Sequence, residues 1–323
     1  RMPADADART FLITSSFRWN DVKRRDQRFP GSLLPLVTFA LLNSSIGAEN
    51  LQPSAGQIAE HVYFVNHFFA VNNVSYGGKR HPMRLINLPA GGTPQNYKLE
   101  RHLNNNYDQG EVRARDLVIF RSGKLRSTGI LVDIYRDDER PLGFAVWLPA
   151  LRKIRRHAEP DPADTWGGSV FTYGDVYLRK PEDERHTLLG KVAFPSCLHM
   201  LEPALEALQP SCDMKGKAVF LLRSVHRIPN WWYDYRDQYI DTQTYADYRA
   251  EYYKEGRLIK VIDKDWRSMQ LDDPRAQYWR YWYGKDLRSG SEGLAWVNEG
   301  QVRWNQKVNK GLWSLATLRR LSR

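Results

Sequence analysis

Two segments rich in aromatic and basic residues, 147–156 and 166–179, carry the side chains best suited to holding a ligand. The first reads Trp-Leu-Pro-Ala-Leu-Arg-Lys-Ile-Arg-Arg, and the second opens Trp-Gly-Gly-Ser-Val-Phe-Thr-Tyr-Gly-Asp. Ligand sites combine apolar and aromatic walls with a few placed polar groups, and arginine suits phosphate oxygens. We therefore expect a site for an amphiphilic molecule. Its walls are Trp147, Leu148, Trp166, Phe171 and Tyr173 near a hydrophobic cavity, with Arg152, Arg155 and Arg156 at the rim.

The basic run at residues 152–156 has a second interpretation. On a strand, Arg152 and Arg156 lie on one face, while Lys153 and Arg155 lie on the other. Exposed lysine and arginine also protect a free strand edge from pairing with another chain. The run is therefore either a headgroup or partner-docking site at the cavity mouth, or a solvated sheet edge.

Residue patterns that support catalysis do not occur in the sequence. No Gly-x-Ser-x-Gly elbow is present, because residues 167–171 lack the closing glycine. His61 and His67 are six residues apart and do not share a helix face, so they do not form a zinc motif. We predict no catalytic residues, no metal site and no cofactor. Three aspartates remain as candidates for a hydrolase, the weakest alternative: Asp164, Asp175 and Asp183.

Residues 23–48 have the order of a secretory signal peptide. A basic patch precedes an apolar stretch at residues 33–42, and Gly47 and Ala48 supply the small residues of a cleavage site. The apolar stretch is too short to span a bilayer of about 30 Å as a helix. No cysteine follows the cleavage site for lipid attachment. We expect a leader over residues 1–48 and a soluble periplasmic protein over residues 49–323.

The predicted mature chain is basic. The full chain carries a net charge of +11, and the leader removes seven Lys/Arg and four Asp/Glu, which leaves +8. Net positive charge is typical of nucleic-acid-binding proteins, but export argues against that partner. Anionic lipid headgroups are the better candidate for the same charge, with peripheral membrane contact as the result.

Cys197 and Cys212 are the cysteines of the chain. Because disulfides persist in oxidising compartments, export favours a bond between them that closes a helix-like insertion bounded by prolines. A loop of this size contributes about 3 kcal/mol in the chain-entropy model. The alternative is two separate buried thiols.

The elements that must position these residues are mostly strands. Ser54 is a suitable N-cap for an amphipathic helix over residues 54–71. From residue 83 to 307, short runs of β-branched and aromatic residues alternate with turn residues, a pattern typical of antiparallel strands. A final helix is expected over residues 313–321. A long meander must curl to protect its edges.

These elements predict an α+β fold, mostly antiparallel β, in which one domain forms a strongly curved, unclosed barrel. The two helices and the 197–212 insertion are expected to plug its concave side. Aromatic clusters at residues 231–235 and 278–283 place large rings on both faces of their strands. Such rings either pack as core or line a cavity.

The combined pattern at residues 147–156 and 166–175 resembles a family of exported outer-membrane lipoprotein-sorting proteins, similar to the periplasmic lipoprotein carrier LolA. Residues 239–242 and 249–260 resemble the family's later strand pair, which ends in Gly-x-Leu-x-Lys. The resemblance covers residues 55–265, and the chain from about 266 is expected as a C-terminal extension. It implies an unclosed β-barrel with helices inside and a hydrophobic cavity for acyl chains.

Two functions follow as hypotheses. The first is a non-enzymatic periplasmic carrier for an acylated or hydrophobic cargo, a lipid or a lipoprotein. The second is a partner-binding accessory subunit of an RND-type exporter at the inner membrane or of another envelope complex. A carrier needs a deep apolar cavity, whereas a docking subunit needs a filled core and an exposed apolar patch.

Overall fold

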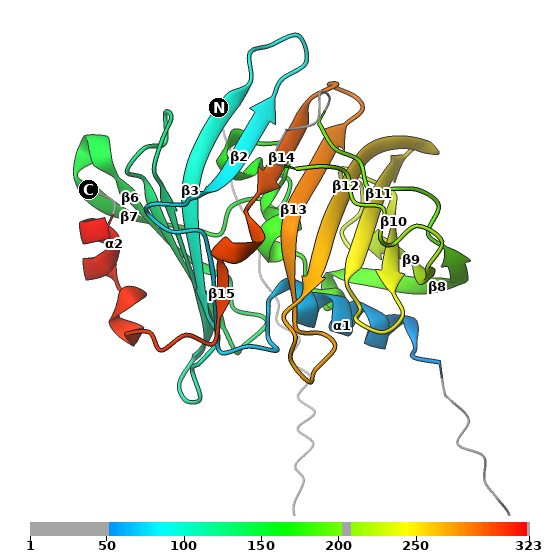
Figure 1. The fold of residues 1–323 in the computed structure, drawn as a ribbon, viewed down its shortest axis with the longest axis horizontal. Helices are drawn as coiled ribbons and strands as arrows, with labels where there is room; N and C mark the ends of the chain where they lie inside the picture. The colour runs from blue at the N-terminus through cyan, green and yellow to red at the C-terminus, as the bar shows by residue number, and fades with distance from the viewer. Residues whose placement is uncertain (1–51, 202–207, 322–323) are drawn as a thin grey trace, which may run out of the picture. The chain divides into compact units, whose positions relative to one another are not determined.

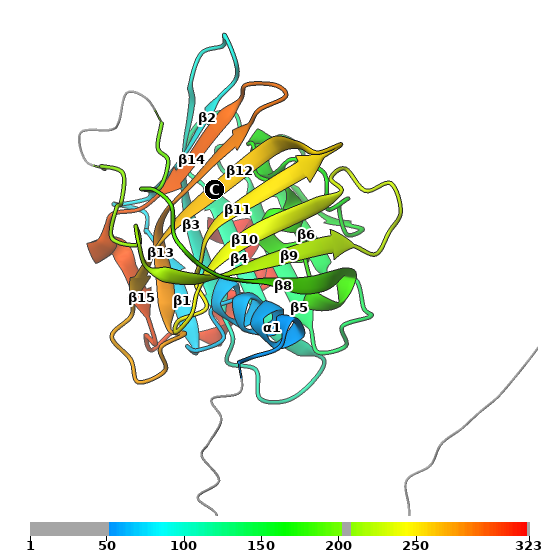
Figure 2. The ribbon, with the colours of Figure 1, turned by 90° about the vertical axis from the view of Figure 1, so that its right-hand side faces the viewer.

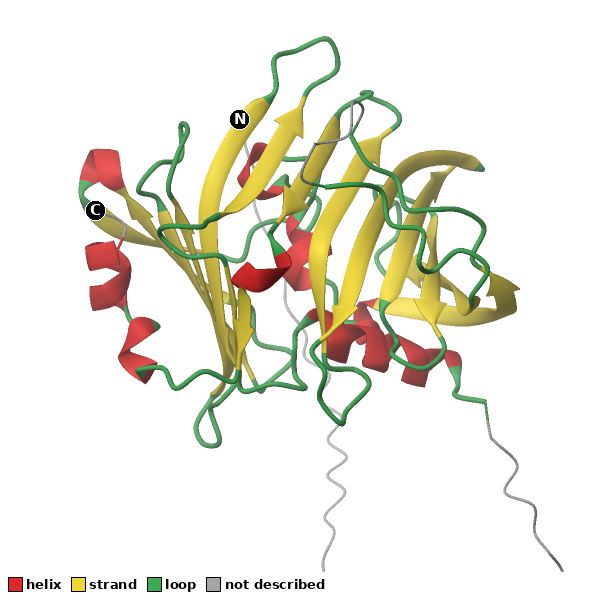
Figure 3. Ribbon diagram, in the orientation of Figure 1, coloured by secondary structure: helices red, strands yellow, loops and turns green. Residues whose placement is uncertain are grey.

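A single β-sheet of fifteen strands dominates the computed structural model over the residues that it describes, 52–201 and 208–321 (Figures 1 and 3). All of its strand pairs are antiparallel. The predicted leader, residues 1–48, lies outside the described residues.

Two meanders make up the sheet. The first contains β2 (Met83–Leu88), β3 (Gln95–Asn104), β4 (Val112–Phe120), β5 (Gly129–Tyr135), β6 (Gly143–Leu148) and β7 (Lys153–His157). The second contains β8 (Glu184–Ala193), β9 (Ala218–His226), β10 (Tyr235–Asp241), β11 (Asp247–Lys254), β12 (Arg257–Ser268) and β13 (Gln277–Asp286). β14 (Glu292–Trp296) joins them by pairing with both β13 and β2. Residues after 266 therefore supply strands at the middle of the sheet.

The sheet is open, because β7 and β8 lie at its two ends and are not paired with each other. It is also strongly curved, and Figures 1 and 2 show short helical segments inside the curve. Two short strands, β1 (Asn73–Tyr76) and β15 (Val302–Trp304), extend the pairing beside β3. The predicted fold class, a mostly antiparallel and unclosed curved sheet, is confirmed.

Alternating side chains divide between a concave and a convex face. On β12, Lys260 and Lys264 lie on the concave face, where they contact the segments inside the curve. Asp263 and Asp265 lie on the convex face, where Asp263 accepts a hydrogen bond from the backbone of His199. Different segments of the chain cover the two faces of the sheet.

Helix α1 (Ala55–Asn66) covers part of the concave face. Ser54 caps it as predicted, because its hydroxyl accepts a hydrogen bond from the Gln57 backbone while the Gln57 side chain accepts one from the Ser54 backbone. The helix ends before the predicted Val71, since the chain turns at Phe68, whose φ of 56° is left-handed.

The segment from residue 158 to 183 also enters the concave side. It includes the short helical turns η2 (Trp166–Gly168), η3 (Gly174–Leu178) and η4 (Pro181–Asp183). We call residues 166–183 the plug. The remaining short turns are η1 (Pro149–Leu151), η5 (Glu299–Gln301) and η6 (Lys310–Leu312).

Two segments expected inside the curve lie on the convex face instead. The described ends of the 197–212 insertion contain no helix, and the Ser211 backbone donates to the Tyr281 hydroxyl at 3.2 Å. Helix α2 (Leu315–Leu321) packs on the outer side of β5, β6 and β7 (Figure 1). Apolar residues on both faces of these strands explain the difference, because either face can bury a helix. The predicted Cys197–Cys212 disulfide is confirmed.

Candidate functional site

The two segments singled out in the sequence separate onto different faces of the sheet. Trp166 and Phe171 are buried in the plug on the concave side, where Trp166 lies 6.0 Å from Phe120 between ring centroids. Phe171 meets Trp282 edge-on at 5.9 Å. Tyr173 is half-buried beside Phe144 (ring centroids 5.9 Å apart), also in the main core. The structure thus brings these three predicted residues to one region.

Trp147 lies on the other face. Its buried side chain belongs to the apolar cluster under α2, together with Ile154 and Leu318. Leu148 is half-buried at the end of β6, and alternation along the strand places it on the opposite side from Trp147. The structure therefore does not bring Trp147 together with Trp166 and Phe171.

The predicted basic run lies at the free end of the sheet. Arg152 is exposed in a left-handed conformation (φ 48°) after η1. Arg155 and Arg156 are exposed on β7, opposite Val146 and Ala145 of β6, so their side chains point to opposite faces. These cations lie on a sheet edge that has no partner strand among the described residues.

The plug is held on the concave face by a buried carboxylate, Asp175. Its two oxygens accept from Lys260 at 2.6 Å, from the Tyr252 hydroxyl at 2.7 Å and from Arg179 at 3.1 Å. The Thr172 backbone adds a further hydrogen bond at 2.9 Å. Both oxygens are therefore fully used inside the protein.

Charge pairing decides the ionisation of this group. Burial raises the pKa of Asp175, but the positive charges of Lys260 and Arg179 outweigh burial, so the pKa falls below its usual range. Both members of the Asp175–Lys260 pair have side chains only 2% exposed. A buried pair of this kind is strongly destabilising to break, because either partner alone becomes an uncompensated charge.

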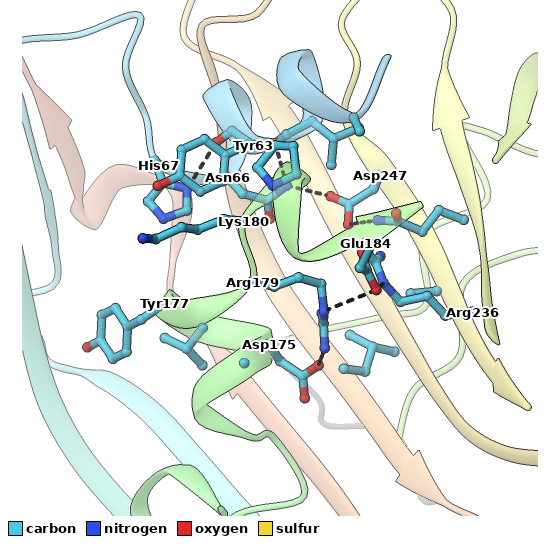
Figure 4. Close-up of a pocket in the computed structure, with 18 of the residues that line it drawn as sticks. Tyr63, Asn66, His67, Asp175, Tyr177, Arg179, Lys180, Glu184, Arg236 and Asp247 are labelled. Atoms are coloured by element: carbon cyan, nitrogen blue, oxygen red, sulfur yellow. Dashed lines mark hydrogen bonds and ion pairs between the residues drawn. The ribbon is translucent and has the colours of Figure 1, made fainter. Parts of the chain in front are cut away.

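Glu184 and Arg236 form a second buried pair, and Arg179 lies between Glu184 and Asp175 (Figure 4). Glu184 accepts from Arg236 at 2.6 and 3.1 Å and from the Tyr233 hydroxyl at 2.7 Å. Burial opposes ionisation of Glu184, but the charge of Arg236 lowers its pKa to about 2. The carboxylate is therefore ionised at neutral pH.

The end of α1 is fixed by a third polar group. Asn66 donates to Asp247 at 2.9 Å and accepts from Lys264 at 2.7 Å, while Lys264 also donates to Asp247 at 2.8 Å. His67 follows directly as the C-cap, and burial lowers its pKa to about 4. Its Nε2 atom has no hydrogen-bond partner among the described residues. His67 is therefore neutral at pH 7 where it caps α1.

Two glycines allow the plug to lie close to the sheet. A Cβ atom at Gly284 would come within 2.8 Å of the Val170 side chain, and one at Gly293 within 2.7 Å of it. Side chains on β13 and β14 at these positions would push the plug away. The sequence therefore favours close packing of the plug at this point.

The space between α1 and the plug is nearly filled in this conformation, whereas a pocket of about 390 Å³ lies between the plug, β2 and β12. The cavity enclosed by α1, the plug and strands β8 to β12 measures about 60 Å³, which suits a few water molecules and not an acyl chain. A larger groove of about 800 Å³ opens beside α1. Its walls combine aromatic rings with charges of both signs: Tyr63, Phe64, Phe69, the arginines Arg113, Arg185, Arg227 and Arg275, and the carboxylates Glu60, Asp138, Glu182 and Glu184.

The charged groups of the site are paired with one another. Within the described residues, no group of three or more His, Cys, Asp or Glu is placed to hold a metal ion. No helix of the described chain is long and apolar enough to cross a membrane. The carboxylates of the site are already engaged by lysine and arginine, so they position the plug.

Sequence reasoning missed Lys260, Lys264, Asp247 and Glu184. Lys260 enters the sequence analysis only as the end of a family-like strand pattern, and Asp175 only as the end of the family-like motif at residues 166–175 and as a possible hydrolase residue. The available signal is the long strand Arg257–Ser268, which carries two lysines and two aspartates among its apolar residues although it lies within the chain's β region. A lysine buried in a central strand requires a buried anion.

Comparisons with known proteins identify the fold. No protein-family model matches the sequence, and no curated protein matches it. Among solved structures, an outer membrane lipoprotein-sorting protein domain from Vibrio parahaemolyticus superposes with a TM-score of 0.61 at 16% identity, covering 82% of this chain and 98% of that one. A DUF1329 family protein from Desulfovibrio piger gives 0.60 at 15% identity, with 82% and 99% covered.

A LolA superfamily protein from Nitrosomonas europaea gives a TM-score of 0.50 at 11% identity, with the same coverage of 82% and 99%. Identities this low establish a shared fold and nothing finer. The resemblance seen at residues 147–175 is thereby confirmed by structure: the chain has the open, curved β-sheet fold of the outer membrane lipoprotein-sorting and LolA-like proteins.

Proposed function

We propose that this protein is a non-enzymatic periplasmic carrier that holds the acyl chains of a lipid or lipoprotein on the concave face, in the place that α1 occupies. The observation that carries the proposal is the apolar wall under α1. Ile58, Ala59 and Val62 of the helix are buried against three side chains of the sheet. Those three are Phe220, Leu222 and Ile240.

Burial of the apolar side chains of α1 and burial of an acyl chain contribute similar free energies. Burying a Val, Leu or Ile side chain contributes about 1.5–3 kcal/mol, so Ile58, Val62 and Val65 together contribute roughly 5–9 kcal/mol. At about 0.8 kcal/mol per methylene, roughly six to eleven methylenes would match that contribution. An acyl chain of ordinary length therefore competes with α1, and a returning α1 helps to release it.

The plug plays a different part. Its buried ion pairs fix the floor of the site, so α1 is the element that moves. The groove beside α1 supplies an aromatic surface with charges of both signs, where an amphiphile first binds. Its volume lies within the range of small-molecule sites, about 300–1,000 Å³.

One observation favours the alternative, a subunit that docks on an RND-type exporter or another envelope complex. The enclosed cavity is small, as expected of a protein with a filled core. In that case α1 is a permanent part of the core and the protein binds no lipid.

Native mass spectrometry of the protein purified from the periplasm, followed by solvent extraction, separates the two. The carrier co-purifies with a stoichiometric lipid or acylated peptide. Leu222→Ala, under α1, lowers the bound fraction, whereas the matched variant Leu131→Ala, buried on the convex face, does not. A ligand-free mass that stays unchanged after incubation with envelope lipids overturns the carrier and supports the docking subunit.

A further inference from the structure

The end of the sheet that carries β7 lies next to α2, and exposed basic side chains surround this edge on both faces of the sheet. We call it the basic corner; it consists of Arg152, Lys153, Arg155, Arg156, Arg319 and Arg320. All six side chains are exposed. No ion pair joins any of them to a carboxylate of the described residues. From this surface we propose that the protein docks on an anionic lipid bilayer through the basic corner.

Tertiary packing creates the basic corner from two distant parts of the chain. Trp313 and Leu318 are buried against Trp147 and half-buried Ile154, which seats α2 over β6 and β7. The Trp313 indole also donates to the His102 backbone oxygen at 2.8 Å. Helix α2, which carries Arg319 and Arg320, thereby lies at the same end of the sheet as β7 (Figure 1).

The chain outside the predicted leader carries other exposed cations, such as Lys79, Arg80 and Lys124, but the basic corner gathers six at one edge of the sheet. That part of the chain has a net charge of +8, and the basic corner supplies six positive charges without an adjacent partner. Some other arginines of the first meander are neutralised, as Arg115 is by Asp133 at 2.6 Å and Arg101 by Asp116 at 2.8 Å. Protection of the β7 edge explains cations on β7, but not the pair on α2.

The basic corner also offers an apolar contact. Leu151, at the turn before β7, is 49% exposed and adjoins Arg152. Basic residues that surround an exposed apolar side chain are typical of surfaces that lie at the lipid headgroups. Clusters of four to eight Lys/Arg bind anionic lipids, and each cation strengthens binding by roughly five-fold.

The test is co-sedimentation of the whole protein with phosphatidylglycerol–phosphatidylcholine vesicles and with pure phosphatidylcholine vesicles. We expect binding to the anionic vesicles only, and its loss between about 0.1 M and about 1 M salt, where the screening length falls from about 10 Å to about 3 Å. Arg319→Gln/Arg320→Gln should weaken binding at least about ten-fold. The triple variant Arg152→Gln/Arg155→Gln/Arg156→Gln should weaken it further.

The matched control removes the same charge elsewhere. Lys124 and Arg126 are exposed in the β4–β5 turn, and Lys124→Gln/Arg126→Gln should change binding by less than about two-fold. Equal losses in the control and in the α2 variant would overturn the proposal, as would equal binding to uncharged vesicles or no binding at all. Docking through the basic corner does not require a bound cargo. A failure to bind vesicles would therefore leave the native mass spectrometry test of cargo binding unaffected.

Discussion

Helices α1 and α2 cover opposite faces of the same sheet, and they are held in different ways. α1 lies on the concave face, where apolar contacts are combined with the Asn66–Asp247–Lys264 group. α2 lies on the convex face over a dry apolar cluster that includes Trp147 and Leu318. The hydrogen bonds at the end of α1 can be replaced by other hydrogen bonds if the helix moves. The buried apolar side chains under α2 have no such replacement in water.

The contrast extends to the two halves of the aromatic and basic motif. Residues 166–179 enter the concave side and end in the buried Asp175, while residues 147–156 turn outward to α2 and the basic corner. Segments adjacent in sequence therefore serve two surfaces: one that we propose holds cargo, and one that we propose meets the membrane.

The largest effect is expected from breaking the plug's ion pair. Lys260→Met leaves Asp175 short of one buried cation, and we expect a loss of about 3–5 kcal/mol in the free energy of unfolding. The double variant Asp175→Asn/Lys260→Met should be more stable than Lys260→Met alone. Urea unfolding measures both.

A surface pair provides the control for that experiment. Lys285 and Glu292 are 3.1 Å apart with side chains 44% and 19% exposed, so Lys285→Met should cost less than about 1 kcal/mol. If Lys260→Met were as mild as Lys285→Met, the ion pair would not hold the plug.

The convex side should respond in another way. Leu318→Ala removes a fully buried side chain from under α2, and we expect a loss of about 2–4 kcal/mol. Proteolysis should then cut the chain near residue 313 more readily. Vesicle binding should also weaken, because α2 no longer holds Arg319 and Arg320 beside β7. Cargo binding should be unchanged; a loss of cargo would contradict the separation of the two faces.

Acid should act on α1 through His67. Its pKa is lowered to about 4 in the folded protein from 6.5 in the unfolded chain, so the unfolded state takes up the proton first. The stabilising contribution is complete above pH 6.5 and is lost as the pH falls toward 4, by about 2 kcal/mol at pH 5.

His61, His186 and His226 are partly buried and also have lowered pKa values. The contribution of His67 must therefore be measured as the difference between a His67 variant and the parent protein. Urea unfolding at several pH values should show a shallower fall in stability for His67→Asn than for the parent protein. Parallel curves for the two proteins would show that His67 does not titrate on unfolding.

Much of this fold follows from local sequence. The Ser54 cap, the strand–turn alternation and the proximity of Cys197 to Cys212 depend on neighbouring residues or on the compartment expected for the chain. The curved sheet follows because a long antiparallel meander must bend. These features required no knowledge of which face of a strand is buried.

The site was harder to predict because it depends on which face of the sheet each side chain occupies. Trp147 and Leu148 are adjacent in sequence, yet alternation sends them to opposite sides, and apolar residues on both faces of β4 to β6 gave no sign of which side is concave. Asp175 and Lys260 are 85 residues apart, and nothing local pairs them. Likewise, the basic run gave no indication that α2 would bring two more arginines beside it.

Hydrogen–deuterium exchange of α1, measured with and without a bound fatty-acid lipid, tests the central claim most directly. If cargo takes the place of α1, the amides of residues 55–66 should exchange faster in the complex, while those of β9 and β10 should exchange more slowly. Slower or unchanged exchange of α1 in a complex shown by native mass to contain lipid would contradict the account.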